Sequence, residues 1–379
     1  MSIHYLDHNA TSPLRDDSRA AVEHALSLGG NPSSVHAKGR AARTVIERAR
    51  DQVAALAGAQ ARDVIFTSGG TEANALALWG AVQGAAEAGA RITRLFVSAI
   101  EHASVLANAA AIAERMPAIR LAMIPVTGDG VVDLSALRVL LREGKGRALV
   151  AVMAANNETG VVQPLIDVSS LLQDHEGYLF VDAIQAAGKI AFDFTADYLS
   201  LSAHKLGGPQ GTGALIVREG VPLSPTILGG GQERGQRAGT ENVSGIAGFG
   251  AAAGISVTLS AELRDRFEAE LKRVVPQVVI FGVGAKRLPN TSNFALPGIA
   301  AETAVMAFDL DGVMVSSGSA CSSGKVAPSH VLRAMGVPET LAASALRVSF
   351  GWNSTAADVD AALTSISDLL SRVKARAAA

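Results

Sequence analysis

Residues 178–205 read YLFVDAIQAAGKIAFDFTADYLSLSAHK and contain two short runs typical of strands, 178–181 and 198–202. The first run ends at Asp182, and the second leads into His204 and Lys205. Because ligands of open α/β sheets bind beyond the carboxyl ends of the strands, this spacing predicts a polar site at one edge of a sheet.

Strand-like and helix-like patterns alternate on both sides of this stretch. Further strands are predicted at 63–67, 95–99, 121–125, 148–153 and 213–217, and helices between them at 73–82, 102–115, 134–142 and 164–174. Hydrophobic residues make up 49% of the chain but aromatic residues only 4%, which suits an aliphatic core of helices over a buried sheet. The fold class is therefore α/β, with a mainly parallel seven-stranded sheet flanked by helices.

The pattern changes after a charge-free stretch at 242–261. A charged helix at 261–274 is followed by short strands at 278–281, 292–296 and 346–350 and a closing helix at 355–376. We therefore expect a large domain of residues 15–257 and a smaller α+β domain of residues 1–14 and 258–379.

Charge and hydropathy exclude several classes of function. The net charge is −2 without a block of basic residues, so nucleic acid and anionic membranes are not expected ligands. The first residues lack a secretory leader, which favours a cytoplasmic protein. The charge-free stretch carries Gly250 and Gly254 at GxxxG spacing, but its four glycines and its Ser and Thr residues favour a buried helix over a membrane span. The histidines are scattered and there is one cysteine, so no metal site is predicted.

Several strand ends carry residues that suit pyridoxal phosphate. That cofactor needs an amine for its aldehyde, a carboxylate for its pyridine nitrogen, a phosphate cradle and a group over its ring. Lys205, Asp182 and His102 supply three of these, and the glycine-rich turn at 68–72 supplies the cradle, with Thr71 capping the following helix. The alternative for Lys205 and Asp182 is a buried ion pair.

Arg347 lies on the strand predicted near the end of the chain. A guanidinium group binds a carboxylate through two hydrogen bonds, so this side chain is suited to the carboxylate of an amino acid substrate. The alternative is a surface arginine on a strand.

Cys321 is the only cysteine and lies among small polar residues at 316–324. This setting favours an accessible thiol that acts as a nucleophile, and the alternative is a cysteine that happens to lie in a surface loop. A Cys-His hydrolase using Cys321 with His102 or His330 would leave Lys205 and Asp182 unexplained.

Motifs along nearly the whole chain strongly resemble the cysteine desulfurases of the nitrogen-fixation and iron-sulfur-cluster type, in the class V aminotransferase branch of fold-type I pyridoxal-phosphate enzymes. They lie at 6–11, 31–34, 66–72, 101–102, 156–160, 181–185, 202–205, 229–242 and in the Cys321 loop.

The resemblance implies a role for each matching residue. Lys205 would bind the cofactor covalently, Asp182 its pyridine nitrogen and Gln185 its ring hydroxyl, while His102 would stack on the ring and act as an acid or base. The phosphate would be held by Gly70, Thr71, Ser202, His204 and, from a partner subunit, Thr240. Asn157 would contact the cofactor and, with Arg347, the substrate carboxylate.

The resemblance also implies a reaction and its partners. L-cysteine would be converted to L-alanine, with its sulfur passed to Cys321 as a persulfide and then to an acceptor protein for iron-sulfur or nitrogenase clusters or a thio-cofactor. A homodimer is implied through Thr240. The alternatives are a selenocysteine lyase or another class V enzyme and, from a different class, a non-catalytic sulfur carrier or scaffold.

Overall fold

The computed structural model describes residues 3–255, 259–317 and 329–378. Its helices are α1 Asp16–Leu28, α2 Ala37–Ala57, α3 Gly70–Glu87, α4 Ala103–Arg115, α5 Leu134–Arg142, α6 Leu165–Gln173, α7 Val243–Ala253, α8 Glu262–Val274, α9 Ala301–Leu310, α10 His330–Ala334, α11 Glu339–Ala342 and α12 Ala356–Ala378. Its strands are β1 His4–Tyr5, β2 Val64–Thr67, β3 Ile92–Ser98, β4 Arg120–Ile124, β5 Arg147–Ala151, β6 Gly177–Asp182, β7 Tyr198–Ser202, β8 Gly213–Val217, β9 Val279–Ile280, β10 Thr291–Ala295, β11 Val313–Met314, β12 Ser316–Ser317 and β13 Ala345–Ser349.

Within the described residues, one sheet contains seven strands in the order β2-β8-β7-β6-β5-β3-β4. The pairs from β7 through to β4 are parallel, and β8 is antiparallel to both of its neighbours. The predicted fold class, an α/β fold around a mainly parallel seven-stranded sheet, is confirmed.

Strand β8 runs against its neighbours because its connection is short. Residues 203–212 join β7 to β8, and a crossover that returned the chain parallel to β7 would need a dozen or more residues. These residues instead form a tight turn that starts with the 3₁₀ segment Ala203–Lys205. Lys205 is therefore placed at the carboxyl end of β7, in the turn itself.

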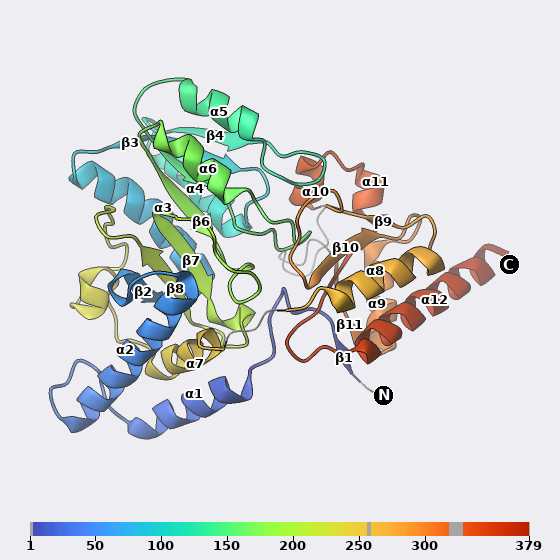
Figure 1. Ribbon diagram of the computed structural model, residues 1–379, viewed down its shortest axis with the longest axis horizontal. Helices are drawn as coiled ribbons and strands as arrows, with labels where there is room; N and C mark the ends of the chain where they lie inside the picture. The colour runs from blue at the N-terminus through green and yellow to red at the C-terminus, as the bar shows by residue number, and fades with distance from the viewer. Residues whose placement is uncertain (1–2, 256–258, 318–328, 379) are drawn as a thin grey trace.

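Helices cover both faces of this sheet, which gives three layers (Figure 1). On one face, α3 and α4 pack through Leu76 and Ile112 onto Phe180 of β6. On the other face, α2, α5, α6 and α7 pack onto alternate side chains of the same strands, such as Val150 and Val181. Because both faces are covered, the central strands are buried along nearly their whole length.

The rest of the chain forms a second, smaller sheet with its own core. Strands β12, β13, β10 and β9 pair antiparallel in that order, and β1 pairs parallel with β11. Helices α8, α9 and α12 pack on this sheet around Phe267, Phe294 and Phe308. In Figure 1 this part lies beside the larger sheet, and α12 runs along its outer side.

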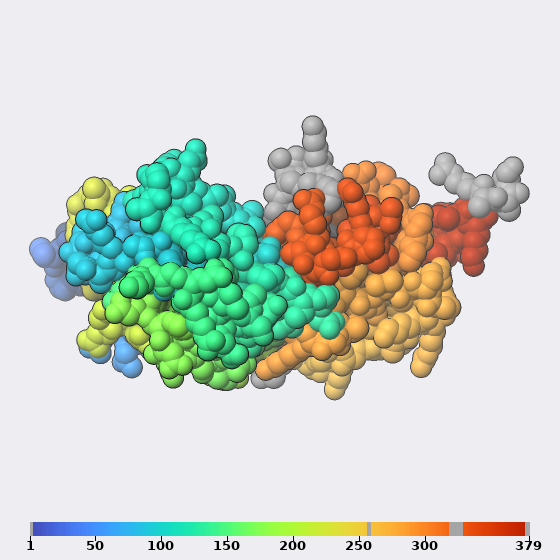
Figure 2. Space-filling view, turned by 90° about the horizontal axis from the view of Figure 1, so that it is seen from above, coloured from blue at the N-terminus to red at the C-terminus, as the bar shows by residue number. Residues whose placement is uncertain are grey.

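A separate apolar cluster joins the two parts. Ile100 and Met153, which follow strands of the larger sheet, pack against Phe281, Ala295 and Val331 from the smaller part. Figure 2 shows the two parts in contact side by side. The predicted domain boundaries stay a prediction, but the packing places the ends of β3 and β5 against the smaller sheet.

The elements differ from the sequence predictions in a few places. Strand β3 starts at Ile92 rather than residue 95, β5 ends at Ala151 rather than 153, and the N-cap of α3 is Gly69 rather than Thr71. The charge-free stretch forms α7, whose Gly250 lies so close to α2 that an added Cβ would be 2.6 Å from the Ala49 Cα atom. Across the described residues, no helix combines the length and apolarity needed to cross a membrane.

Candidate active site

A cavity of about 340 Å³ opens at the carboxyl ends of β3, β5, β6 and β7. Ten of the twelve predicted site residues line it, namely Gly70, Thr71, His102, Asn157, Asp182, Gln185, Ser202, His204, Lys205 and Arg347. The lining also includes Asn9, Ala10, Ser104, Met153 and Ile184, to which the sequence had assigned no role. The predicted convergence of polar residues at one sheet edge is therefore confirmed, with Arg347 added from the smaller sheet.

Asp182 is the last residue of β6 and is only 4% exposed. Its Oδ2 atom accepts a hydrogen bond from Asn74 Nδ2 at 2.8 Å, and its Oδ1 atom accepts one from the Ile184 N–H at 3.0 Å. Burial raises the pKa of Asp182, while His102, these hydrogen bonds and Lys205 act in the opposite direction. A buried carboxylate that lines a cavity in this way would be stabilised further by a bound cationic group.

Lys205 is held by the N-terminal segment. Its Nζ atom donates hydrogen bonds to the main-chain oxygens of Asn9 at 2.6 Å and Ala10 at 2.7 Å. The amine therefore lies in the cavity that Asp182 also lines. Asn9 lies in the motif at 6–11, but only the folded chain brings its carbonyl to this lysine.

Gln185 is oriented by a second, buried lysine. Lys189 Nζ donates to Gln185 Oε1 at 2.8 Å and to Asn9 Oδ1 at 3.1 Å, and Gln185 Nε2 donates to the Asn9 carbonyl at 2.9 Å. Burial lowers the pKa of Lys189 well below its usual value, and the positive charges of Lys205 and Arg347 lower it further. Lys189 thus fixes which end of the Gln185 amide is the donor, so that Nε2 is the atom able to donate to a ligand oxygen.

The N-terminus of α3 forms one wall of the cavity through Gly70 and Thr71. Gly69 precedes it with φ 155° and ψ 178°, a conformation that is essentially restricted to glycine. A Cβ on Gly70 would lie 2.2 Å from Ile184 Cδ1, so a side chain there would push Ile184, which lines the same cavity. The free N–H groups and the dipole of a helix N-terminus favour a phosphate.

Two histidines lie near this wall. His204 contacts Thr11 Oγ1 through Nδ1 at 3.2 Å, and burial lowers its pKa to about 4, with a further contribution from Lys205. At neutral pH, His204 is therefore an uncharged imidazole that can donate one hydrogen bond. His102 is the N-cap of α4, and its Nδ1 atom accepts from the Ser104 N–H at 3.1 Å.

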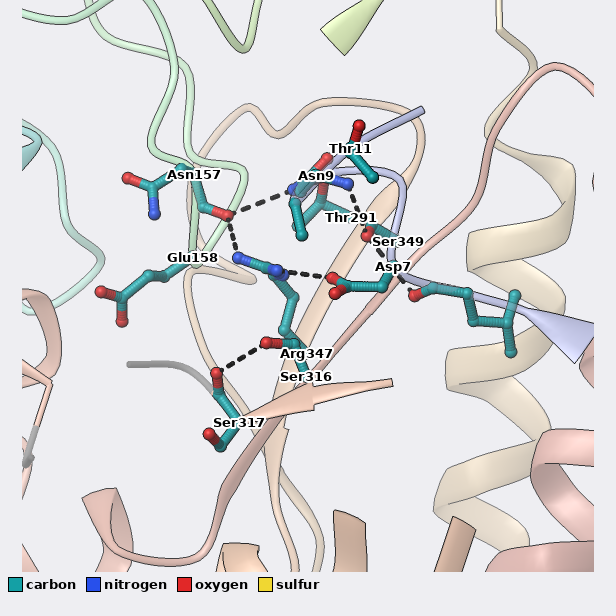
Figure 3. Close-up of polar contacts among 12 residues, drawn as sticks. Asp7, Asn9, Thr11, Asn157, Glu158, Thr291, Ser316, Ser317, Arg347 and Ser349 are labelled. Carbon is teal, nitrogen blue, oxygen red and sulfur yellow. Dashed lines mark hydrogen bonds and ion pairs between the residues drawn. The ribbon is translucent and has the colours of Figure 1, made fainter. Parts of the chain in front are cut away.

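Arg347 reaches the cavity from β13 and is 3% exposed, so the alternative of a surface arginine is wrong. Its Nη1 atom donates to the Asn157 carbonyl at 3.0 Å, and its Nη2 atom donates to Asp7 Oδ1 at 2.6 Å. Figure 3 shows the guanidinium group held between these two oxygens. Its buried Nε atom has no hydrogen-bond partner among the described residues. A fixed guanidinium group of this kind is suited to a carboxylate ligand.

Of the predicted site residues that the structure describes, Thr240 does not line this cavity. Thr240 is exposed and lines a different hollow, together with Ser68, Arg237 and Glu241 of the same chain. Cys321 lies outside the described residues.

The residues of the cavity fit pyridoxal phosphate. An amine, a buried carboxylate and a helix N-terminus meet in one cavity, whose volume lies in the range of small-molecule sites. The buried Arg347 Nε atom, which has no protein partner in the described chain, marks a place for a further anionic group. Fold and site together define a pyridoxal-phosphate-dependent α/β enzyme.

Comparison with known proteins gives the family. Residues 4–362 match the aminotransferase class-V family, and the chain belongs to that family. The chain is 42% identical to a cysteine desulfurase of Cereibacter sphaeroides, with 98% of this chain and 96% of the relative aligned. It is 39% identical to cysteine desulfurase IscS of Dictyoglomus turgidum, over 97% and 94% of the two chains. A solved NifS-like protein of Rickettsia africae superposes with a TM-score of 0.87 at 34% identity, covering 98% of this chain and 100% of the other.

Proposed function

We propose that the protein is a pyridoxal-phosphate-dependent cysteine desulfurase that converts L-cysteine to L-alanine and passes the sulfur to Cys321. The observation that carries the proposal is the meeting of Lys205, Asp182 and Arg347 in one cavity. It is supported by the similarity over nearly the full length of the chain to proteins named cysteine desulfurases.

Each residue has a role that its surroundings support. Lys205 binds the cofactor through its amine and afterwards moves the proton of the substrate α-carbon. Asp182 holds the pyridine nitrogen, and Gln185, oriented by Lys189, donates to the ring hydroxyl. Arg347, together with Asn157, binds the substrate carboxylate.

The remaining residues hold the phosphate and the ring. Gly70, Thr71, Ser202 and His204 bind the phosphate at the N-terminus of α3. His102, which lines the same cavity, would stack on the ring of the bound cofactor and exchange protons with the substrate. When bound, the cofactor supplies an electron sink that makes the α-proton of the substrate acidic.

Both described ends of the segment that carries Cys321 are close to the cavity. Strand β12 ends at Ser317, next to Ser316, which pairs with Arg347. The chain is described again from Ser329, whose Oγ atom donates to Glu158 and caps α10. Four residue steps separate Ser317 from Cys321 and allow a span of at most about 14 Å. We propose that this short connection brings the thiol to a substrate bound at Arg347.

The sulfur step balances as a transfer between two thiols. The Cys321 thiolate attacks the sulfur of the bound cysteine, a sulfur–sulfur bond forms, and the carbon–sulfur bond breaks. The electron pair of that bond stays on the substrate carbon and takes up a proton, which gives alanine. Cys321 then holds the persulfide that an acceptor protein removes.

The proposal includes a homodimer and an acceptor protein for iron-sulfur cluster or thio-cofactor assembly. The location of Thr240 outside its own cavity supports the dimer, since a phosphate ligand from that loop would then come from a second copy. The acceptor is proposed from the similarity to IscS and NifS-like proteins.

One set of experiments tests the function. Purified protein should show a visible band from the cofactor, and borohydride treatment followed by peptide mapping should find the adduct on Lys205. L-cysteine should yield alanine and, with a thiol reductant, sulfide in equal amounts. Cys321→Ala should keep the cofactor band and lose sulfur release.

Each outcome has a separate meaning. An adduct elsewhere than Lys205, or no alanine from cysteine, would reject the desulfurase. Undiminished sulfur release by the Cys321→Ala protein would reject the persulfide step alone. A strong preference for selenocysteine over cysteine would favour a selenocysteine lyase, and protein without cofactor or alanine release would favour a sulfur carrier.

A further inference from the structure

A buried chain of hydrogen bonds links Asp182 to His102 through two residues that the proposed function does not use. Asn74 Nδ2 donates to Asp182 Oδ2 at 2.8 Å and to Ser104 Oγ at 2.9 Å. Ser104 Oγ in turn contacts His102 Nδ1 at 2.7 Å. Asn74 is fully buried on α3, and Ser104, in the first turn of α4, is 9% exposed.

The direction of each bond follows from the chemistry of the groups. A carboxylate accepts hydrogen bonds, so the Asn74 amide must present its NH₂ group to Asp182. The second hydrogen of that NH₂ group is directed to Ser104 Oγ, which accepts it and is left to donate its own hydrogen to His102 Nδ1. The Ser104 N–H donates to the same nitrogen at 3.1 Å.

Two donors facing Nδ1 determine the tautomer of His102. A hydrogen on Nδ1 would point at the Ser104 N–H, so neutral His102 carries its hydrogen on Nε2. Among the described residues, the titratable groups that interact electrostatically with His102 include Asp182, Glu158 and His330. Nδ1 itself makes hydrogen bonds with the hydroxyl and the N–H of Ser104.

We propose that Asn74 and Ser104 are positioning residues that hold His102 in the Nε2–H tautomer and tie its ring to the carboxylate of Asp182. Any proton that His102 exchanges with a bound molecule then passes through Nε2. Asp182 and His102, the two residues that would contact the cofactor ring, are thereby held as one unit. This inference rests on the proposed function, which gives Asp182 and His102 their ligand.

A second set of hydrogen bonds joins α3 to α4 near Ser104. Trp79 Nε1 donates to Asn108 Oδ1 at 2.8 Å, and Asn108 Nδ2 donates to the Ser104 carbonyl at 2.7 Å. These bonds fix the backbone of α4 at Ser104 from the solvent side. Asn108 thus holds the backbone of Ser104 while Asn74 and His102 hold its hydroxyl, which a positioning role requires.

Nitrogen NMR of histidine-labelled protein tests the proposal directly. The His102 signals are assigned by their loss in His102→Gln, and wild-type protein should show the widely separated Nδ1 and Nε2 shifts of one tautomer. In Ser104→Ala the separation should narrow, because losing one hydrogen bond changes the tautomer ratio by about two- to ten-fold. Ser104→Thr, which keeps the hydroxyl, should restore the wild-type shifts.

Kinetics with L-cysteine supply a second readout. Ser104→Ala should lower kcat with little change in KM, since the substrate carboxylate site at Arg347 is untouched, and Ser104→Thr should recover kcat. Ser365→Ala is the matched control, because this buried serine of α12 also makes a side-chain hydrogen bond, to the Asp311 carboxylate, and neither residue lines the cavity. It should change neither the shifts nor kcat.

The outcomes separate positioning from simple helix capping. If Ser104→Ala lowers only the free energy of unfolding, with the tautomer and kcat unchanged, the proposal is overturned. The NMR readout does not depend on desulfurase activity, so failure of the proposed function, seen as no adduct on Lys205 in wild-type protein, is detected separately.

Discussion

Arg347 has its Nη atoms occupied by Asp7 and Asn157, while its Nε atom is buried and has no partner within the described chain. If this side chain binds the substrate carboxylate, Arg347→Lys should raise KM for L-cysteine by about 10- to 100-fold, because a charged hydrogen bond contributes about 1.5–3 kcal/mol. The value of kcat should change much less, since the carboxylate does not react and is bound equally in the ground and transition states. Steady-state kinetics measure both constants.

A matched variant separates binding from stability in that experiment. Arg287 forms a buried pair with Glu268 through two hydrogen bonds of 2.6 and 2.8 Å, outside the cavity. Arg287→Lys should weaken the fold without changing KM. A normal KM in Arg347→Lys would contradict the role given to Arg347.

Glu158 is 4% exposed, and burial raises its pKa to about 7, against the hydrogen bond from Ser329 and the charges of Arg347 and His102. Between pH 4.5 and 7 the folded protein keeps a proton that the unfolded chain has released, so this group lowers stability as the pH rises through that window. Glu158→Gln removes the effect. From pH 5 to pH 8 the variant should gain about 2–3 kcal/mol relative to wild type in urea unfolding.

The control for this measurement is Glu268→Gln. Glu268 is 7% exposed but is paired with Arg287, so removing its charge leaves a buried cation and should cost stability at every pH in the window. Parallel pH profiles for wild type and Glu158→Gln would show that Glu158 is ionised in the folded protein throughout.

Site residues could be predicted where the residue type and its position after a strand are enough to indicate the chemistry. Asp182 and Lys205 follow predicted strands, and in the folded chain the buried carboxylate of Asp182 accepts a hydrogen bond from Asn74. No role could be assigned to Asn9 or Lys189 from the sequence. Asn9 acts through its main-chain oxygen, and Lys189 acts by orienting a side-chain amide, and neither contact can be recognised from a residue type. Such contacts appear only when the N-terminal segment is folded against the sheet.

At the scale of elements, the start of α3 depends on the backbone of Gly69. With φ 155° and ψ 178°, Gly69→Ala should cost about 1–3 kcal/mol, although an added Cβ would meet nothing within 4 Å. The strain is relieved by moving the first turn of α3 away from the phosphate position. We expect the dissociation constant of pyridoxal phosphate to rise by about five-fold or more, measured by loss of the visible band on dialysis.

Gly89→Ala is the control, because it introduces backbone strain at a position that does not line the cavity. Gly89 follows α3 with φ 73°, and its added Cβ would also meet nothing within 4 Å. It should cost about 1–2 kcal/mol of stability and leave cofactor affinity unchanged. Equal loss of cofactor in both variants would mean that general destabilisation, and not the start of α3, controls retention.

Most elements with a periodic pattern of large apolar residues could be predicted from the sequence. Elements that bury only small residues, or that are very short, could not. All seven strands of the large sheet were predicted from their aliphatic runs, which are buried throughout in strands such as β2 and β8 and only partly in the edge strand β4. Helix α1 was not predicted because its buried residues are Ser18 and Ala25 alone, which leave no apolar period to detect. Helix α2 was not predicted either, although it buries Ile46 and Val53 at helical spacing. The two-residue strands β11 and β12 are defined by their partners rather than by their own sequence.

At the scale of the whole molecule, the cavity is built from both parts of the chain, with Arg347 from the smaller sheet and Lys205 from the larger. Thr240 does not line this cavity. Its loop is joined to the first turn of α3 by Arg237, which donates to Glu72 at 2.8 and 3.1 Å, and so lies on the outer side of the phosphate position. A loop fixed in this place is suited to reach the cavity of a second copy.

Complementation between inactive subunits tests that arrangement. Thr240→Asp should abolish activity by placing a carboxylate beside the phosphate, and Lys205→Ala should abolish it by removing the amine. In a mixed dimer, the subunit with intact Lys205 receives an intact Thr240 from its partner, so one site of the two is complete. Co-expression of the two variants with different tags should therefore restore up to about one quarter of wild-type activity, since about half of randomly paired dimers are mixed. Purified mixed dimers should reach about one half, whereas a Thr240 that acts within its own subunit would leave every combination inactive.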